Sequence, residues 1–292
     1  MTMARRLIPL LMAGSVVISF QGAASGQAEG DQPIRIMALG DSITGSPGCW
    51  RAYLWQDLIE GGFTDIDMVG SLEPEGCGFE YDGEHEGHGG IKTRTIASSG
   101  VTRSWLKLHP ADILLVHLGT NDIWGGGSST KTILDDFSVI VEDAREVNPE
   151  IAILIAQIIP MASDSCIDCP DRIIELNSAI PNWAEEVSRP ESPVWSVDQW
   201  TGFDPGSDTY DGVHPNDTGN LKIAARWFEA LIPVLESISE TPSSSGERAV
   251  SEDPGILTVE TVNQPLPAVA IGLAVLVLVI GVMAYLVFDQ EH

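Results

Sequence analysis

The sequence predicts an α/β protein in which a five-stranded parallel sheet lies between two layers of helices, in the doubly wound, flavodoxin-like arrangement. Five short apolar segments alternate with segments whose apolar residues recur every three to four positions, as in amphipathic helices. Two of the strand segments are almost continuously apolar, as expected for central parallel strands that are covered on both faces. Because such strand–helix–strand connections form right-handed crossovers, helices are expected on both faces of the sheet.

Each expected strand is short and apolar. The strands are expected at 34–39, 65–69, 112–118, 151–159 and 194–197. Each expected helix carries an apolar stripe with the helical period. The stripes are Trp50, Tyr53, Leu54 and Leu58; Ile133, Leu134, Phe137, Ile140, Val141 and Ala144; Ile173, Leu176, Ile180, Trp183 and Val187; and Leu221, Ala224, Ala225, Phe228, Leu231 and Leu235. Ligands of such sheets bind beyond the carboxyl ends of the strands, so the chemistry is expected in the loops there.

The N-terminal segment 1–28 has the organisation of a secretory signal peptide. Two arginines precede an apolar run over 7–20, and small residues follow that run. An N-terminal anchor is the weaker alternative, because the run is shorter than the roughly 20 residues that a membrane span needs. We therefore expect export of the chain, with 29–238 as the folded domain.

The C-terminal segment 266–288 is uncharged and long enough to cross a bilayer as a single helix. Residues 239–265 before it are rich in Ser, Pro, Glu and Thr, which is typical of a disordered stalk. A short tail, 289–292, follows. We expect the helix to anchor the domain on the extracellular face; a processing signal that is later removed is the alternative.

The charge balance excludes several classes of partner. Asp and Glu number 42 and Lys and Arg only 15, so the formal net charge is −27. Nucleic acids and anionic lipid surfaces are bound by clustered cations, and this sequence has few of them. We therefore expect no nucleic-acid partner, and membrane attachment only through the C-terminal helix.

Four cysteines lie in the expected domain, and an even number in an exported protein favours disulfides. Of the three possible pairings, we prefer Cys49–Cys77 with Cys166–Cys169. The Cys-x-x-Cys spacing of the second pair also resembles half of a zinc site or a redox pair, but no second pair accompanies it. His85 and His88 are the alternative metal ligands, although two histidines in a polar loop are usually not ligands. We expect no metal and no cofactor.

Polar residues follow three of the expected strands, where the chemistry should lie. Ser42 follows the first strand, Asn121 follows the third, and Asp211 and His214 follow the fifth. An imidazole that is oriented by a carboxylate can take the proton of a serine hydroxyl, which makes the serine a nucleophile. The Asn121 amide and the Ser42 N–H could stabilise an oxyanion. The alternative for Ser42 is a role as a helix N-cap alone.

These motifs resemble those of the SGNH (GDSL) hydrolases. GDS after the first strand, glycines before Ile91, GTND after the third strand and DxxH near the end of the domain occur in the expected order. GDSITGSPGCWR, YDGEHEGHGGI, HLGTNDIW, AQIIP, DQWTGFDP and YDGVHPND extend the resemblance to carbohydrate esterase family 3, over roughly 33–236.

The resemblance implies the SGNH hydrolase fold and a serine esterase. It implies that Ser42 is the nucleophile, His214 the general base and Asp211 the residue that orients His214. The implied oxyanion hole consists of the Ser42 N–H, the Gly90 N–H (or that of Gly89) and the Asn121 side chain.

The substrate expected from the resemblance is an acetylated polysaccharide such as acetylxylan. A lipid or peptidoglycan acyl hydrolase on the same fold is one alternative, because a fold does not fix a substrate. A non-catalytic carbohydrate-binding protein of the cell surface is another. Trp124 is our candidate for a wall of the substrate site, because it follows Asn121 closely. Asn216 begins a glycosylation sequon next to His214, and we expect it to be unmodified.

Overall fold

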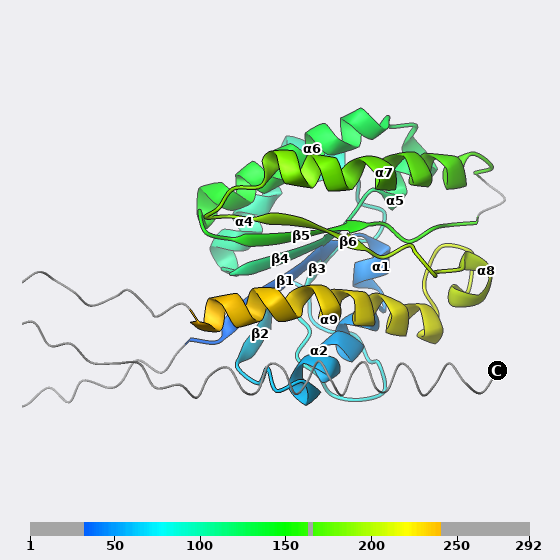
Figure 1. Ribbon diagram of the computed structural model, residues 1–292. Helices are drawn as coiled ribbons and strands as arrows, with labels where there is room; N and C mark the ends of the chain where they lie inside the picture. Colours follow the sequence, from blue (N-terminus) through cyan, green and yellow to red (C-terminus); the bar gives the residue numbers. More distant parts are fainter. Residues whose placement is uncertain (1–31, 163–165, 241–292) are drawn as a thin grey trace, which may run out of the picture. The chain divides into compact units, whose positions relative to one another are not determined.

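The computed structural model describes residues 32–162 and 166–240 (Figure 1). The expected signal peptide, stalk, membrane helix and tail lie outside these residues, apart from the first two residues of the stalk, which fall in the last described helix. Within the two described ranges, no helix combines the length and the apolar character that crossing a bilayer requires.

A parallel sheet forms the centre of the described domain. Its strands are β1 Ile34–Gly40, β2 Ile66–Val69, β3 Glu86–Gly87, β4 Ile113–His117, β5 Ala152–Gln157 and β6 Val194–Asp198. The strand order is β2-β1-β4-β5-β6, with β3 paired to the end of β1. The five predicted strands and their parallel direction are confirmed, and the order is that of the flavodoxin-like fold. The two-residue β3 was missed, because so short a strand carries no periodicity.

The position of β3 matters for the site. β2 pairs with Ile34–Met37 of β1, while β3 pairs with Leu39 and Gly40 on the same side of that strand. β4 occupies the other side of β1, so the order of connection reverses between β1 and β4. Ligands bind at such a switch point in doubly wound sheets.

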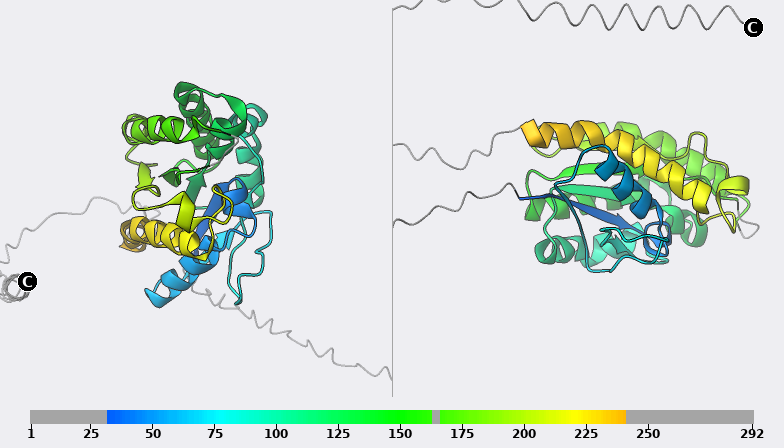
Figure 2. Two further views of the ribbon diagram at one scale, coloured as in Figure 1. Left: turned by 90° about the vertical axis from the view of Figure 1, so that its right-hand side faces the viewer. Right: turned by 90° about the horizontal axis from the view of Figure 1, so that it is seen from below.

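Helices cover both faces of the sheet (Figures 1 and 2). They are α1 Ser42–Gly45, α2 Trp50–Glu60, α3 Thr93–Ser99, α4 Val101–Leu108, α5 Thr120–Gly126, α6 Thr130–Val147, α7 Cys169–Val187, α8 Pro205–Asp208 and α9 Asp217–Glu240. α2 and α9 pack on one face, and α4, α6 and α7 pack on the other, each against its own apolar cluster. The short helices were not predicted, because one or two turns display too little of the helical period.

One predicted stripe was partly wrong. In α9, Leu221 is 53% exposed, whereas Leu231 and Leu235 of the predicted stripe are buried. The buried face also includes Ile223 and Trp227, which the stripe did not contain. The Trp227 ring is fully buried against Trp50 of α2, with ring centroids 6.1 Å apart. Packing of this large ring sets the rotation of the helix, so Leu221 and Ala225 of the predicted stripe face solvent.

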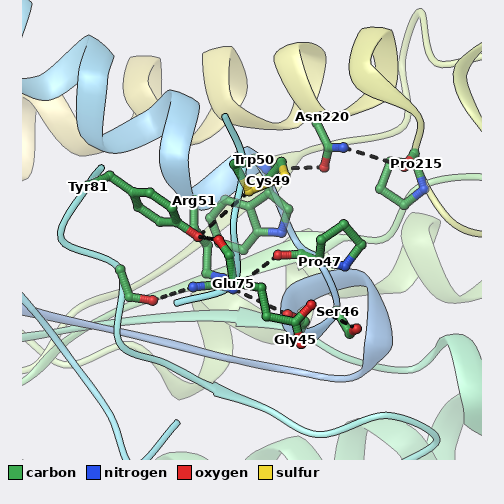
Figure 3. Close-up of a disulfide and its surroundings, with 12 residues drawn as sticks. Gly45, Ser46, Pro47, Cys49, Trp50, Arg51, Glu75, Tyr81, Pro215 and Asn220 are labelled. Carbon is green, nitrogen blue, oxygen red and sulfur yellow. Dashed lines mark hydrogen bonds between the residues drawn. A yellow bond between two sulfur atoms is a disulfide. The ribbon is translucent and has the colours of Figure 1, made fainter. Parts of the chain in front are cut away.

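The structure contains two disulfides, Cys49–Cys77 and Cys166–Cys169. The first ties the long loop between β2 and β3 to the N-terminus of α2 (Figure 3). In the described part of the chain, one group of side chains has ligand atoms close enough together to hold a metal ion: Cys166, Asp168 and Cys169. Both of its sulfur atoms are bonded to each other, so they offer no thiolate to a metal.

Candidate active site

Ser42 is the first residue of α1, directly beyond the carboxyl end of β1. Asp41 caps this helix, because the Ile43 N–H donates to Asp41 Oδ1 over 3.0 Å. The Ser42 N–H therefore lies in the first helical turn, where backbone N–H groups have no acceptor within the helix and favour negative charge. Ser42 is thus a helix-terminal residue, while the cap expected as its alternative role belongs to Asp41.

His214 brings the far end of the domain to Ser42. Its Nε2 lies 2.9 Å from Ser42 Oγ, and its Nδ1 lies 2.7 Å from Asp211 Oδ2. The other carboxylate oxygen, Asp211 Oδ1, accepts the backbone N–H groups of Val213 and His214. The structure therefore brings the three predicted residues into one continuous chain of hydrogen bonds.

These contacts favour an ionised Asp211. Partial burial acts to raise the pKa of its carboxyl, but the hydrogen bonds from the backbone and ring of His214 outweigh burial and lower the pKa. An ionised acceptor at Nδ1 holds the imidazole proton there. Nε2 is then free to accept the Ser42 proton, which is the arrangement that a general base needs.

The predicted glycines form a tight turn beside Ser42. The Ile91 N–H donates to the His88 carbonyl over 3.1 Å, and Gly90 has φ +76° at the third position of this turn. A positive φ at that position is characteristic of a type II turn and favours glycine. A Cβ on Gly89 would lie 3.9 Å from Ser42 Cβ, so the turn is adjacent to the serine. Gly90 N–H has no acceptor among the described residues.

The turn is fixed to β1, the strand that directly precedes the Ser42 helix. His88 N–H donates to the carbonyl of Gly40, the last residue of β1, over 2.9 Å. α1 also packs directly on β3: a Cβ on Gly45 or Gly87 would come within 2.5 Å of the backbone of the other residue. Both positions therefore need glycine for close backbone approach.

Asn121 lies on the same edge of the sheet, in α5 after β4. Its Nδ2 donates to Asp41 Oδ2 over 3.2 Å. The amide group has two hydrogens, so this bond orients the carboxamide and leaves a second donor. Burial raises the pKa of Asp41 to about 7, although the Ile43 N–H and His214 act in the opposite direction.

Asp122 of α5 connects the Asn121 helix to the start of α3. Its carboxylate accepts both the N–H and the hydroxyl of Thr93, at 3.0 and 2.9 Å. Burial raises the pKa of Asp122, and the two bonds from Thr93 partly offset that effect. Because Thr93 begins α3 directly after the glycine turn, Asp122 fixes one end of that turn relative to Asn121.

Two buried residues that sequence reasoning missed hold the elements of the site together (Figure 3). Arg51 donates from Nε to the Thr44 carbonyl over 2.8 Å and from Nη2 to the Gly45 carbonyl over 3.2 Å, so it supports the C-terminal end of α1. Nη1 of Arg51 donates to the Gly83 carbonyl in the disulfide-tied loop. Arg51 directly follows Trp50, the first residue of a predicted apolar stripe, but is not part of that stripe. Only its place at the end of the motif GDSITGSPGCWR could have indicated a role at the site.

Asn220 connects the two halves of the site. Its Oδ1 accepts the N–H of Trp50 over 3.1 Å, and its Nδ2 donates to the Pro215 carbonyl over 3.4 Å. Trp50 in turn donates from Nε1 to the Ile43 carbonyl in α1 over 3.0 Å. One buried amide thus connects α1, which carries Ser42, to residues 209–216, the loop that carries His214 (the histidine loop). No sequence pattern indicated Asn220.

His85, His88 and His117 have structural contacts. His85 Nδ1 accepts the Gly87 N–H over 2.9 Å. His88 lies 2.8 Å from the buried Glu86 carboxylate and stacks on Trp105, with centroids 4.8 Å apart. The two histidines thus engage separate partners and do not form a shared ligand set. His117 is buried in β4, and burial lowers its pKa to about 4, so it is a neutral core residue.

Two further predicted residues have clear positions. Trp124 is half-buried in α5 and packs against the core on the side of α6 and α7. Its role as a substrate wall stays a prediction. Asn216 Nδ2 donates to the Ser207 carbonyl over 2.8 Å, and its Oδ1 accepts the Gly219 N–H over 3.1 Å. An amide committed to these bonds is a poor acceptor for a glycan.

Comparison with known proteins identifies the family. The GDSL-like Lipase/Acylhydrolase family matches residues 38–222. A carbohydrate esterase family 3 protein from Talaromyces cellulolyticus is 30% identical, with a TM-score of 0.64 over 70% of this chain and 99% of that one. An acetyl esterase variant crystallised with an acetate ion is 29% identical, with the same TM-score and coverage.

A multidomain esterase from Ruminococcus flavefaciens is 28% identical in an alignment of 230 positions that covers 70% of this chain. The matched region spans 29% of that larger relative. The family match covers more than half of the chain, and the esterases align over most of the described domain. The chain therefore belongs to the GDSL-like lipase/acylhydrolase family, has carbohydrate esterases of family 3 as structural neighbours, and is a carboxylic ester hydrolase.

Proposed function

We propose that this esterase removes acetyl groups from a polysaccharide of the acetylxylan type, with Ser42 as nucleophile, His214 as general base and acid, and Asp211 as its orienter. The observation that carries the proposal is the hydrogen-bond chain from Ser42 Oγ through the imidazole to the Asp211 carboxylate. A serine hydroxyl is weakly nucleophilic until such a base removes its proton.

The proposed reaction has two halves. Ser42 Oγ attacks the ester carbonyl while its proton moves to His214 Nε2, and a tetrahedral oxyanion forms. The imidazolium then gives that proton to the sugar oxygen, the C–O bond breaks and an acetyl-serine remains. Water attacks this ester with His214 as base, and the proton returns to Ser42 as acetate leaves. The N–H groups of Ser42 and Gly90 and the Asn121 amide are the proposed donors to both oxyanions.

Two features support the choice of substrate. The protein crystallised with acetate is an acetyl esterase, and the Talaromyces cellulolyticus relative is a carbohydrate esterase. The acidic composition disfavours a site built for anionic lipid headgroups. Trp124 is the proposed apolar wall of the substrate site.

The test is acetate release by the full chain from acetylated xylan, compared with release of long acyl chains from lipid esters. We expect the acetylated xylan to be the preferred substrate. Ser42→Ala should lower acetate release by at least about 10³-fold, whereas Ser98→Ala, on the exposed face of α3, should leave it unchanged. Preference for long acyl chains would support the lipid hydrolase instead. Glycan binding without turnover by the unaltered protein would support the non-catalytic alternative.

The proposal includes export and tethering. The basic start and apolar run of 1–28 support a signal peptide, and the uncharged stretch 266–288 supports a membrane helix that holds the esterase outside the cell. Deletion of 266–292 should move the protein from the membrane fraction to the soluble fraction after cell lysis. Recovery of the intact chain in the soluble fraction would contradict the tether.

A further inference from the structure

We infer that Tyr210 forms a subsite for the alcohol part of the ester, where its exposed ring binds the pyranose ring that carries the acetyl group. This inference rests on the proposed function and assigns one side of the substrate to one side of the site. Tyr210 directly precedes Asp211 and was not among the residues that the sequence pattern singled out.

The Tyr210 ring lies against the ring of His214. The two are nearly parallel, with an interplanar angle of 13° and centroids 5.7 Å apart. The backbone holds this arrangement, because the Tyr210 N–H donates to the His214 carbonyl over 3.1 Å and Thr209 pairs with Pro215 in an antiparallel bridge. The tyrosine is therefore a fixed neighbour of the imidazole and not a residue of a distant loop.

The exposure of Tyr210 is unusual for a large aromatic residue. It is 63% exposed, so it contributes little apolar burial to the core. Its hydroxyl makes no hydrogen bond to any described residue. An exposed aromatic ring of this kind offers an apolar face, which suits the apolar C–H surface of a pyranose.

The chemistry determines which part of the substrate meets this ring. The imidazole must give its proton to the oxygen of the departing alcohol, so that alcohol lies on the His214 side of the scissile bond. The carbonyl oxygen lies toward the proposed oxyanion donors, the N–H groups of Ser42 and Gly90, and the acetyl methyl group occupies a third direction. Tyr210 contacts His214, so it lies on the alcohol side. A pyranose that carries a single acetyl group is the substrate class this placement fits.

The test compares three acetates with increasing alcohol size: ethyl acetate, cyclohexyl acetate and acetylated xylotriose. In the full chain, Tyr210→Ala should lower kcat/KM by about tenfold for the two ring alcohols and by less than twofold for ethyl acetate. Tyr210→Phe should retain kcat/KM for all three, because the ring and not the hydroxyl supplies the contact. Trp195→Ala is the matched control, since Trp195 is also exposed but lies near the opposite, N-terminal end of β6.

Two results would overturn the subsite. Equal losses for all three acetates would mean that Tyr210 acts on His214 and not on the alcohol, and unchanged values for all three would mean that it binds nothing. Failure of the unaltered protein to cleave acetylated xylotriose would instead refute the polysaccharide substrate. The ratio of cyclohexyl to ethyl acetate would still decide the role of Tyr210 in that case.

Discussion

The helix that carries Ser42 and the loop that carries His214 meet within one hydrogen bond, but they are built very differently. α1 is surrounded by buried polar groups: Asp41 caps it from one end and the fully buried Arg51 binds its carbonyls at the other. The histidine loop, residues 209–216, is less deeply buried: Tyr210 and Asp211 face solvent, and His214 is half-buried. The loop is joined to the rest of the domain by few bonds, such as Ala162 N–H to the Gly212 carbonyl over 2.8 Å.

Because of this contrast, we expect the residues beneath α1 to affect mainly the stability of the domain and the residues of the histidine loop to affect mainly its activity. Substitutions beneath α1 remove hydrogen bonds from buried carbonyls and should destabilise the whole domain. Substitutions in the histidine loop remove few buried contacts, so they should change the reaction while the fold persists. The domain thus places the nucleophile on a buried support and the base in a half-buried loop, and each side can be tested with its own measurement.

The largest expected effect concerns Asp211→Asn in the exposed loop. The N–H groups of Val213 and His214 hold an oxygen at the Oδ1 position, so the new amide nitrogen would face His214 Nδ1. The imidazole would then carry its proton on Nε2 and could not accept from Ser42. We expect kcat to fall by about 10³- to 10⁴-fold with an unfolding free energy within about 1 kcal/mol of the unaltered protein.

The control is Asp135→Asn, whose carboxylate is exposed on α6 and, among the described residues, pairs only with Lys131 in the preceding turn. It should leave both quantities unchanged. Retention of most of the kcat by Asp211→Asn would contradict the role of the carboxylate, and a large loss of stability would contradict the separation of the two regions.

Arg51→Met tests the buried side. The guanidinium donates to four backbone carbonyls, of Thr44, Gly45, Pro47 and Gly83, and the variant leaves them without these donors. We expect urea denaturation to show a loss of about 3–5 kcal/mol of unfolding free energy. Arg226→Met, which removes a partly exposed pair with Glu229, should cost less than about 1 kcal/mol. Equal effects of the two variants would mean that Arg51 does not support α1.

Asn220→Ala tests the connection between the regions. The variant removes the amide that relates Trp50 to Pro215, so the histidine loop can shift relative to Ser42. We expect kcat to fall about tenfold with KM nearly unchanged, because the loss concerns the alignment of groups and not binding. Asn220→Asp keeps the acceptor for Trp50 but not the donor to Pro215, and it should show the same loss. Unchanged kcat in both would show that the loop is positioned by its other bonds.

The fold was predictable from the sequence because its main elements carry strong periodic patterns. The buried strands are continuous apolar runs, and long helices such as α6 and α7 bury most of the predicted stripe. The short elements were not predictable: β3 has two residues, and its pairing with β1 depends on glycine-to-glycine packing of α1. Such backbone approach leaves no hydrophobic signal in the sequence.

The residues of the candidate site divide in the same way. Ser42, Asn121, Asp211 and His214 were predictable, because their side-chain chemistry is distinctive and each follows a strand. Arg51 and Asn220 were missed, because their partners are backbone carbonyls and N–H groups that only the tertiary structure brings near. Tyr210 was missed for a different reason: nothing in the sequence distinguishes a tyrosine that stacks on His214 from one that faces solvent.

Asp41→Asn is expected to have the smallest effect. It tests whether ionisation of the buried Asp41 carboxyl, next to Ser42, lowers the stability of the domain. Burial raises the pKa of Asp41 to about 7, whereas an aspartate in the unfolded chain titrates near 4. Between these two values the unfolded chain has released its proton and the folded chain has not. The contribution of Asp41 to the unfolding free energy therefore falls as the pH rises from about 4 to about 7 and is constant above that range.

Asparagine caps a helix about as well as aspartate but does not ionise, so Asp41→Asn removes the pH-dependent part of the contribution. Its Nδ2 takes the place of Oδ2, so the variant also loses the bond from Asn121 Nδ2, at a cost that does not change with pH. We expect the variant to gain at least about 1 kcal/mol relative to the unaltered protein between pH 4.5 and pH 8, measured by urea denaturation. Asp135→Asn, which changes an exposed carboxylate of α6, is the control and is measured over the same range. A gain confined to Asp41→Asn would mean that the protein tolerates a costly buried carboxylate beside Ser42, where it holds the Asn121 amide in place.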